Sequence, residues 1–179
     1  MPISAGFAVF YILIVKEDWL TFFPHAFAIS FRLGRAMGLV QYIYTSILVE
    51  ELSAQNAFDT SSMSVRVCQH YGITGRVFAN RYQALVITEG PQQTVDHYFQ
   101  SIQKDPMTGT QILHSQQEIH KREFDDYSVW LNLGQGFEFS GDVRELTQET
   151  LPLAWPENLS AKVRIMANAY LDADMLAPY

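Results

Sequence analysis

The fold is decided by the stretch that runs from Gly72 to Pro91, whose sequence is GITGRVFANRYQALVITEGP. Residues 73–78 are rich in apolar and β-branched side chains, residues 79–81 have the composition of a turn, and residues 82–87 are nearly all apolar. This pattern predicts a β-hairpin with a buried second strand. Pro91 then suits the first turn of a helix. One apolar face of that helix can pack on the hairpin, and it consists of Val95, Tyr98, Phe99 and Ile102.

On both sides of this hairpin, strands and helices follow in an order that predicts an α+β fold. Residues 39–46 are rich in β-formers. Ser53 is a suitable N-cap for a helix of weak propensity that extends to about Cys68. A fourth strand is expected to begin at Gln111 and a fifth to span residues 127–133. The order predicts a ferredoxin-like, five-stranded mixed sheet that carries two helices on one face.

The other face of such a sheet needs a cover, which the C-terminal residues can supply as a helical cap. Residues 134–141 have the composition of a linker, and residues 142–148 have the pattern of a short helix. An amphipathic helix follows, with an apolar face of Leu159, Val163, Met166 and Tyr170. We therefore expect an apolar N-terminal extension at residues 1–36, a domain at 37–133 and a C-terminal helical extension at 134–179.

Residues 1–36 do not share the pattern of the rest of the chain. Their two apolar runs, residues 6–15 and 19–31, are both shorter than the roughly 18–20 residues that a membrane-spanning helix needs. No basic residue precedes the first run, as it would in a signal peptide. Three interpretations stay open: translation begins at Met37 and the upstream residues are an artefact, the runs lie on a membrane as a hairpin, or they add a packing element. Membrane contact is expected only if these residues are genuine.

The composition narrows the range of functions. The chain has 179 residues, of which 48% are hydrophobic, and this predicts one globular domain with extensions. Its net charge of −7, without a Lys/Arg cluster, argues against nucleic acid as a partner. The single cysteine, Cys68, excludes internal disulfides and indicates a cytoplasmic protein. The sequence shows no phosphate loop, catalytic triad order or metal-ligand spacing, so we expect neither enzymatic activity nor a metal site.

Five motifs occur in the order and spacing of a known family. They are LVQYIYTS at residues 39–46, GITG at 72–75, TEGP at 88–91, IQKDP at 102–106 and REFDDY at 122–127. Over about residues 38–133 the chain resembles the BLUF family, the sensors of blue light using flavin. The resemblance implies a ferredoxin-like fold that holds FAD between its two helices.

The resemblance also implies a light-driven switch, in which electrons and protons move between the flavin and a tyrosine while a glutamine amide between them changes its hydrogen bonds. Tyr44 has the position of that tyrosine, and Val86 has the position of the glutamine. An aliphatic side chain neither donates nor accepts hydrogen bonds. The relay therefore lacks its middle member. Gln83 is not a simple substitute, because a shift of three residues along a strand reverses the face.

Other positions of the implied flavin pocket are altered as well. Cys68 replaces the family's flavin-binding asparagine, Met107 and Thr108 replace an Arg-His pair, and Val129 replaces a methionine. Ser64 keeps the family's residue type. The loss of roughly three polar contacts, at about 1–3 kcal/mol each, weakens flavin binding by roughly 3–9 kcal/mol. The implied pocket positions are Tyr44, Ser64, Cys68, Val86, Met107 and Thr108.

Three functions remain as hypotheses. The first is a sensory or regulatory protein that acts by protein–protein contact, with a degraded flavin pocket and photoswitch. Its partner is an unidentified regulatory protein, and the chain is expected to form a homo-oligomer. The alternatives are a functional FAD-binding blue-light photoreceptor with unusual pocket residues, and a structural or oligomerisation module. Under the first hypothesis Tyr44 is a core tyrosine and Cys68 an inert buried thiol.

Overall fold

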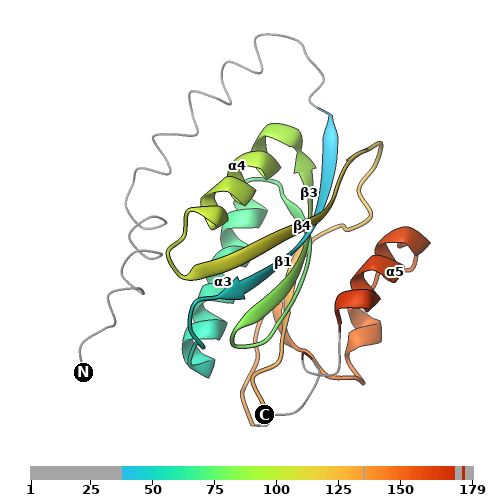
Figure 1. Ribbon diagram of the computed structural model, residues 1–179. Coiled ribbons are helices and arrows are strands. Elements are labelled where there is room, and N and C mark those ends of the chain that lie inside the picture. The colour runs from blue at the N-terminus through green and yellow to red at the C-terminus, as the bar shows by residue number, and fades with distance from the viewer. Residues whose placement is uncertain (1–37, 135, 172–174, 176–179) are drawn as a thin grey trace.

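A computed structural model describes residues 38–134, 136–171 and 175 of the chain (Figure 1). The elements follow one another as β1 (Leu39–Leu48), α3 (Ala54–His70), β2 (Thr74–Ala79), β3 (Gln83–Pro91), α4 (Gln92–Gln103), β4 (Thr108–Ile119), β5 (Tyr127–Leu131), β6 (Val143–Glu145), the 3-10 helix η1 (Leu151–Ala154) and α5 (Ala161–Tyr170). No helix among these residues is long and apolar enough to cross a membrane. The predictions for residues 1–36 lie outside the described residues.

The strands form one mixed sheet in the order β4-β1-β3-β2-β5-β6. β1 pairs antiparallel with β3 and β4, and β2 pairs antiparallel with β3 and parallel with β5. With α3 and α4, the first four strands have the ferredoxin-like connectivity, so the predicted fold class is confirmed.

The predicted number of five strands is wrong by one, because residues 142–148 contain the strand β6 instead of a short helix. Val143 of β6 pairs with Val129 of β5 and is buried. The burial of this one valine against the sheet outweighs the local helix preference of its polar neighbours, since strand formation depends strongly on tertiary context.

The hairpin between β2 and β3 forms for two local reasons. The Asn80 side chain accepts hydrogen bonds from the backbone N–H groups of Tyr82 and Gln83, at 3.1 and 3.0 Å, which closes the turn. Gly75 lets the two strands approach closely, because a Cβ atom there would lie 1.9 Å from the carbonyl oxygen of Ile87. The φ angle of Gly75 is 149°, which also favours glycine.

Both helices cover the same face of the sheet, as predicted. Ser53 caps α3, and its hydroxyl accepts a hydrogen bond from the backbone N–H of Asn56 at 3.2 Å. Pro91, expected in the first turn of α4, is its N-cap instead. Val65 of α3 and Val95 of α4 belong to one buried cluster with the even-numbered residues between positions 40 and 44 of β1.

The opposite face is covered by the C-terminal residues, so the predicted helical cap is confirmed. Figure 1 shows α5 on the other side of the sheet from α3 and α4. Val163 is fully buried and shares a cluster with Ile43 of β1. Leu159 is also buried, whereas Met166 and Tyr170 are partly buried at the border of this cluster.

A buried polar network lies on the cap side of the sheet and joins its central strands. Gln41 donates to Glu89 Oε1 at 2.8 Å, and Gln117 donates to Gln41 Oε1 at 2.8 Å. Glu89 Oε2 accepts from the backbone N–H groups of Glu123 and Phe124, at 2.9 and 3.1 Å. Burial raises the pKa of the Glu89 carboxyl group above its ordinary value, although these hydrogen bonds oppose the shift.

Candidate functional site

A cavity of about 840 Å³ lies between the sheet and the two helices that cover it. Its floor is made by two rows of side chains that cross the sheet at right angles to the strands. The deeper row consists of Tyr44, Val86, Val77 and Val129, and the outer row consists of Ser46, Ala84, Ala79 and Leu131. The outer row contains three small residues, which leave space above the sheet that larger side chains would fill.

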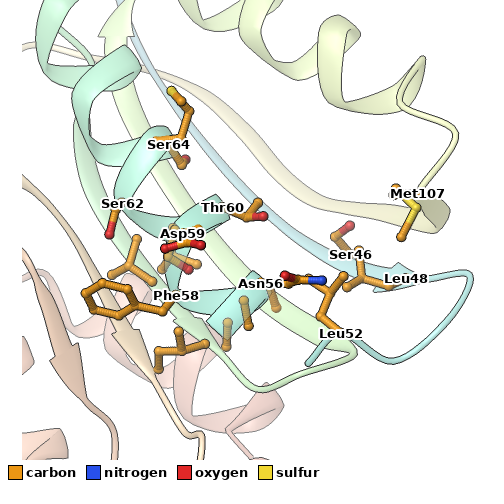
Figure 2. A pocket seen from close by; sticks show the side chains of 18 of the residues that line it. Ser46, Leu48, Leu52, Asn56, Phe58, Asp59, Thr60, Ser62, Ser64 and Met107 are labelled. Carbon is orange, nitrogen blue, oxygen red and sulfur yellow. The ribbon is translucent and has the colours of Figure 1, made fainter. Parts of the chain in front are cut away.

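The walls of the cavity come from three segments. α3 contributes residues between Asn56 and Arg66, and α4 contributes Tyr98 and Ile102. Figure 2 shows Met107, from the segment between α4 and β4, beside Ser46 and Leu48 of β1, while the α3 side chains lie on the other side. The cavity is therefore the space between the two helices in which the family resemblance implies a cofactor.

Tyr44 is the most deeply buried side chain of the cavity floor. It is 0% exposed, and its hydroxyl group has no hydrogen-bond partner among the described residues. Its ring packs edge-on against Phe99, with ring centroids 4.9 Å apart. Burial raises the pKa of the Tyr44 phenol well above its ordinary value. The phenol is thus a neutral group with an unused donor and acceptor.

Val86 is the direct cross-strand partner of Tyr44, so the two side chains lie next to each other on the same face. Gln83 pairs with Ile47, and the alternation of side chains along β3 directs it to the opposite face of the sheet from Val86. Gln83 touches the lining of the cavity only because it is the first residue of β3, at the edge of the opening. The residue next to Tyr44 is therefore aliphatic.

A cluster of hydroxyl groups lies at the deep end of the cavity. Ser64 and Tyr98 are joined by a hydrogen bond of 3.0 Å, and the hydroxyls of Tyr98 and Tyr127 lie 3.3 Å apart. Cys68 contacts all three residues, and burial raises the pKa of its thiol to about 12. The Cys68 side chain is fully buried and inert as a thiolate nucleophile at neutral pH.

The structure brings most of the sequence-predicted pocket residues together. Tyr44, Ser64, Val86, Met107 and Thr108 line the cavity. The sixth predicted residue, the cysteine of α3, lies behind the hydroxyl cluster, where it supports the wall.

Several polar residues of the lining could not be assigned to it from the sequence, and Tyr98, Tyr127 and Asn80 are among them. The helical spacing of Tyr98 places it on the apolar face of its helix, and this inward position is the sequence signal for its place in the lining. The Asn80 amide nitrogen is buried and has no partner among the described residues, while its oxygen closes the hairpin turn.

The charged residues of the lining are mostly acidic. Glu50, Glu51 and Asp59 are exposed at the mouth, and Asp105 is buried further in. Arg66 is the one cation among the described lining residues. Burial raises the pKa of the Asp105 carboxyl group. Within the part of the chain that the structure describes, no group of three or more His, Cys, Asp or Glu residues could hold a metal ion.

Several solved structures have a similar fold. Klebsiella pneumoniae BlrP1, in a complex with calcium and cy-diGMP, aligns with a TM-score of 0.55 and 18% identity over 74% of this chain. BlsA in its photo-activated state aligns with a TM-score of 0.52 and 18% identity over 75% of this chain and 96% of its own. A bacterial light-regulated adenylyl cyclase gives a TM-score of 0.51 and 17% identity over 74% of this chain. At identities this low, the likeness to these structures concerns the fold alone.

This chain spans about a third of the length of two of these proteins, 33% of BlrP1 and 35% of the cyclase. No match was found among curated protein sequences. The sequence profile described as "Sensors of blue-light using FAD" matches residues 39–130, which are about half of the chain. The match covers β1 through most of β5, and with them all of the floor except Leu131 and both helical walls of the cavity. The chain therefore belongs to the BLUF family.

Proposed function

We propose that this chain is a regulatory BLUF module that acts by contact with another protein and lacks the light-driven hydrogen-bond switch of its family. The observation that carries the proposal is the pairing of Tyr44 with Val86. The switch needs a side chain beside the tyrosine that both donates and accepts hydrogen bonds, and valine does neither. The unpartnered Tyr44 hydroxyl supports the same conclusion.

The family description names FAD, and the described residues fit only part of that molecule. A cavity of about 840 Å³ is within the usual size range of ligand sites. The Tyr44 hydroxyl could bond to a polar atom at the edge of a ring. The pyrophosphate of FAD is dianionic, however, and the lining offers it one guanidinium, that of Arg66, against several carboxylates. The residues do not fit FAD as a whole, and the proposal includes no step that passes through it.

Protein contact is supported by apolar side chains that stay exposed near one end of the sheet. Ile47 belongs to β1, Val49 follows that strand directly, and Ile112 and Leu113 belong to β4; all four are at least 40% exposed. β4 is also an edge strand of 12 residues, and an edge strand has unpaired backbone groups that can bind another strand. A homo-oligomer that pairs along β4, or a regulatory protein that binds there, fits these features. The acidic chain is not expected to bind nucleic acid.

Under this proposal the protein is cytoplasmic and has no enzymatic activity. A functional photoreceptor with unusual pocket residues is the second candidate. It is favoured by the open cavity, whose floor still contains the buried Tyr44. A cavity without any binding role would cost stability, because its walls lose packing contacts.

Illumination of the purified chain separates the two candidates. The protein is loaded with flavin, and its absorption spectrum is recorded before and during blue light. The proposed function predicts no red shift of the flavin band, while a functional photoreceptor predicts a reversible red shift. A red shift that disappears in Tyr44→Phe would overturn the proposal.

A further inference from the structure

The mouth of the cavity is acidic, whereas its interior is lined by aromatic and small side chains, and both features restrict the kind of ligand that can bind. We infer that the cavity binds a planar aromatic compound without phosphate groups, and that its acidic mouth selects against phosphorylated flavins. The inference rests on the proposed function for the location of the site, and it adds the class of ligand.

The interior favours an aromatic ring with polar atoms at its edge. Four aromatic residues line this space together with small and β-branched side chains: Tyr44 in the floor, and Phe58, Tyr98 and Tyr127 around it. Such a space suits a flat, apolar body, because aromatic side chains pack well against other rings. Figure 2 shows Phe58 and the Ser64 hydroxyl on the α3 side of this space.

Two buried polar groups of the lining lack a partner among the described residues. They are the hydroxyl of Tyr44, which is 0% exposed, and the amide nitrogen of Asn80, which is 4% exposed as a residue. Buried polar groups are normally hydrogen-bonded, so each exception needs an explanation. An acceptor atom of a bound ligand would satisfy each of these groups. The two unpartnered atoms are therefore evidence for a bound ligand that does not depend on the charge at the mouth.

The mouth disfavours a ligand that carries phosphate. Glu50 and Asp59 are exposed there without an ion-pair partner among the described residues, and Asp59 accepts a hydrogen bond from the neutral Gln55 at 2.9 Å. Glu51 pairs with Arg81 at 3.2 Å, so its charge is largely compensated. A phosphate in the same opening would meet like charges at short range, where salt screens them only in part.

One feature of the mouth would favour an anion, namely the N-terminus of α3. Ser53 already caps this helix through its hydroxyl group, and Glu50 and Glu51 precede it directly in the chain. These carboxylates can interact with the positive end of the helix dipole, which is a favourable place for negative charge. The helix end is therefore already supplied with capping groups from the protein.

The test compares three flavins that share one ring system. Riboflavin, FMN and FAD are titrated into the full-length chain, and binding is followed by quenching of flavin fluorescence. At low ionic strength riboflavin should bind at least about tenfold more tightly than FAD, and the ratio should shrink as salt rises from about 0.02 to about 0.5 M. FAD binding as tight as riboflavin at low salt, or no binding of riboflavin, would overturn the inference.

Two sets of variants connect the result to the residues. E50Q/D59N should lower the ratio of riboflavin affinity to FAD affinity at least about threefold. The variant removes negative charge from the mouth, so FAD should bind more tightly. E149Q/E157Q is the matched control, since it makes the same change in net charge at exposed residues outside the cavity, and it should leave the ratio unchanged. Equal effects of the two sets would contradict the role of the mouth.

Tyr44→Phe should weaken riboflavin binding severalfold, because the ring is kept and only the hydroxyl is lost. Unchanged affinity would show that the hydroxyl does not contact the ligand and would overturn that part of the inference. These results are distinct from a failure of the proposed function, which would appear as a light-induced red shift and not as a change in flavin preference.

Discussion

The docking of α5 on the sheet can be tested by placing a charge in its contact. Val163 is 0% exposed and packs in a cluster with Ile43, Phe78 and Leu85. Val163→Asp should lose about 1.5–3 kcal/mol of apolar burial. It should lose about 1–3 kcal/mol more because a polar group is buried without a partner. The sum is roughly 2.5–6 kcal/mol, which is a large part of the usual stability of a domain.

Urea unfolding, followed by tryptophan fluorescence, measures this loss. Trp130 and Trp155 both pack in or against the cluster that contains Val163, so their emission reports on it. The melting temperature should fall by about 2–4 °C for each kcal/mol. If the Asp variant does not fold, Val163→Ala provides a milder change of about 1.5 kcal/mol.

The matched control is Ile165→Asp, which places the same charge on the same helix at a side chain that is 69% exposed. Its stability should stay within about 0.5 kcal/mol of the wild-type value. If Val163→Asp were equally harmless, α5 would not be docked on the sheet in solution, and the two-sided fold would be wrong.

Three further predictions concern the residues that surround the hairpin and the cavity. Because burial raises the pKa of Glu89 above 4.5 in the folded state, its proton is held more tightly there than in the unfolded chain. This contribution to stability is full below pH 4.5 and is lost as the pH rises through the folded-state pKa. Glu89→Gln should therefore flatten the pH dependence of the free energy of urea unfolding in this window. An unchanged pH dependence in the variant would refute the prediction. Gly75→Ala should cost about 3 kcal/mol or more, measured by the same unfolding assay, whereas Gly38→Ala, where a Cβ meets no atom within 4 Å, should cost little. Cys68, with a thiol pKa of about 12, should resist alkylation at pH 8 in the native protein and react in urea; fast native labelling would contradict its burial.

The sequence was sufficient to predict the central fold because its signals there are local. The turn composition around Asn80, the N-cap at Ser53 and the helical spacing of apolar residues each act within a few positions. The family assignment, made from five short motifs, is confirmed by the profile match over residues 39–130. β6 was missed because it has only three residues, and its pairing with β5 depends on contacts that no local pattern records.

The cavity could be predicted only in part. The resemblance indicated which positions surround it, and the pairing of Tyr44 with Val86 follows from the register of two strands. Its volume, however, depends on Ser46, Ala84 and Ala79 standing in one row across three strands. That row becomes visible only when the strand order and register are known. The hydroxyl cluster at the deep end of the cavity depends in the same way on contacts between distant segments.

The most direct test of the central claim is a light–dark difference spectrum of the riboflavin-loaded chain and of Val86→Gln. The account predicts no red shift for the wild-type chain, because the residue beside Tyr44 cannot exchange hydrogen bonds. It predicts a reversible red shift for Val86→Gln, which returns an amide to that position, and no shift for the double variant with Tyr44→Phe. A reversible red shift of the wild-type chain that Tyr44→Phe removes would contradict the account.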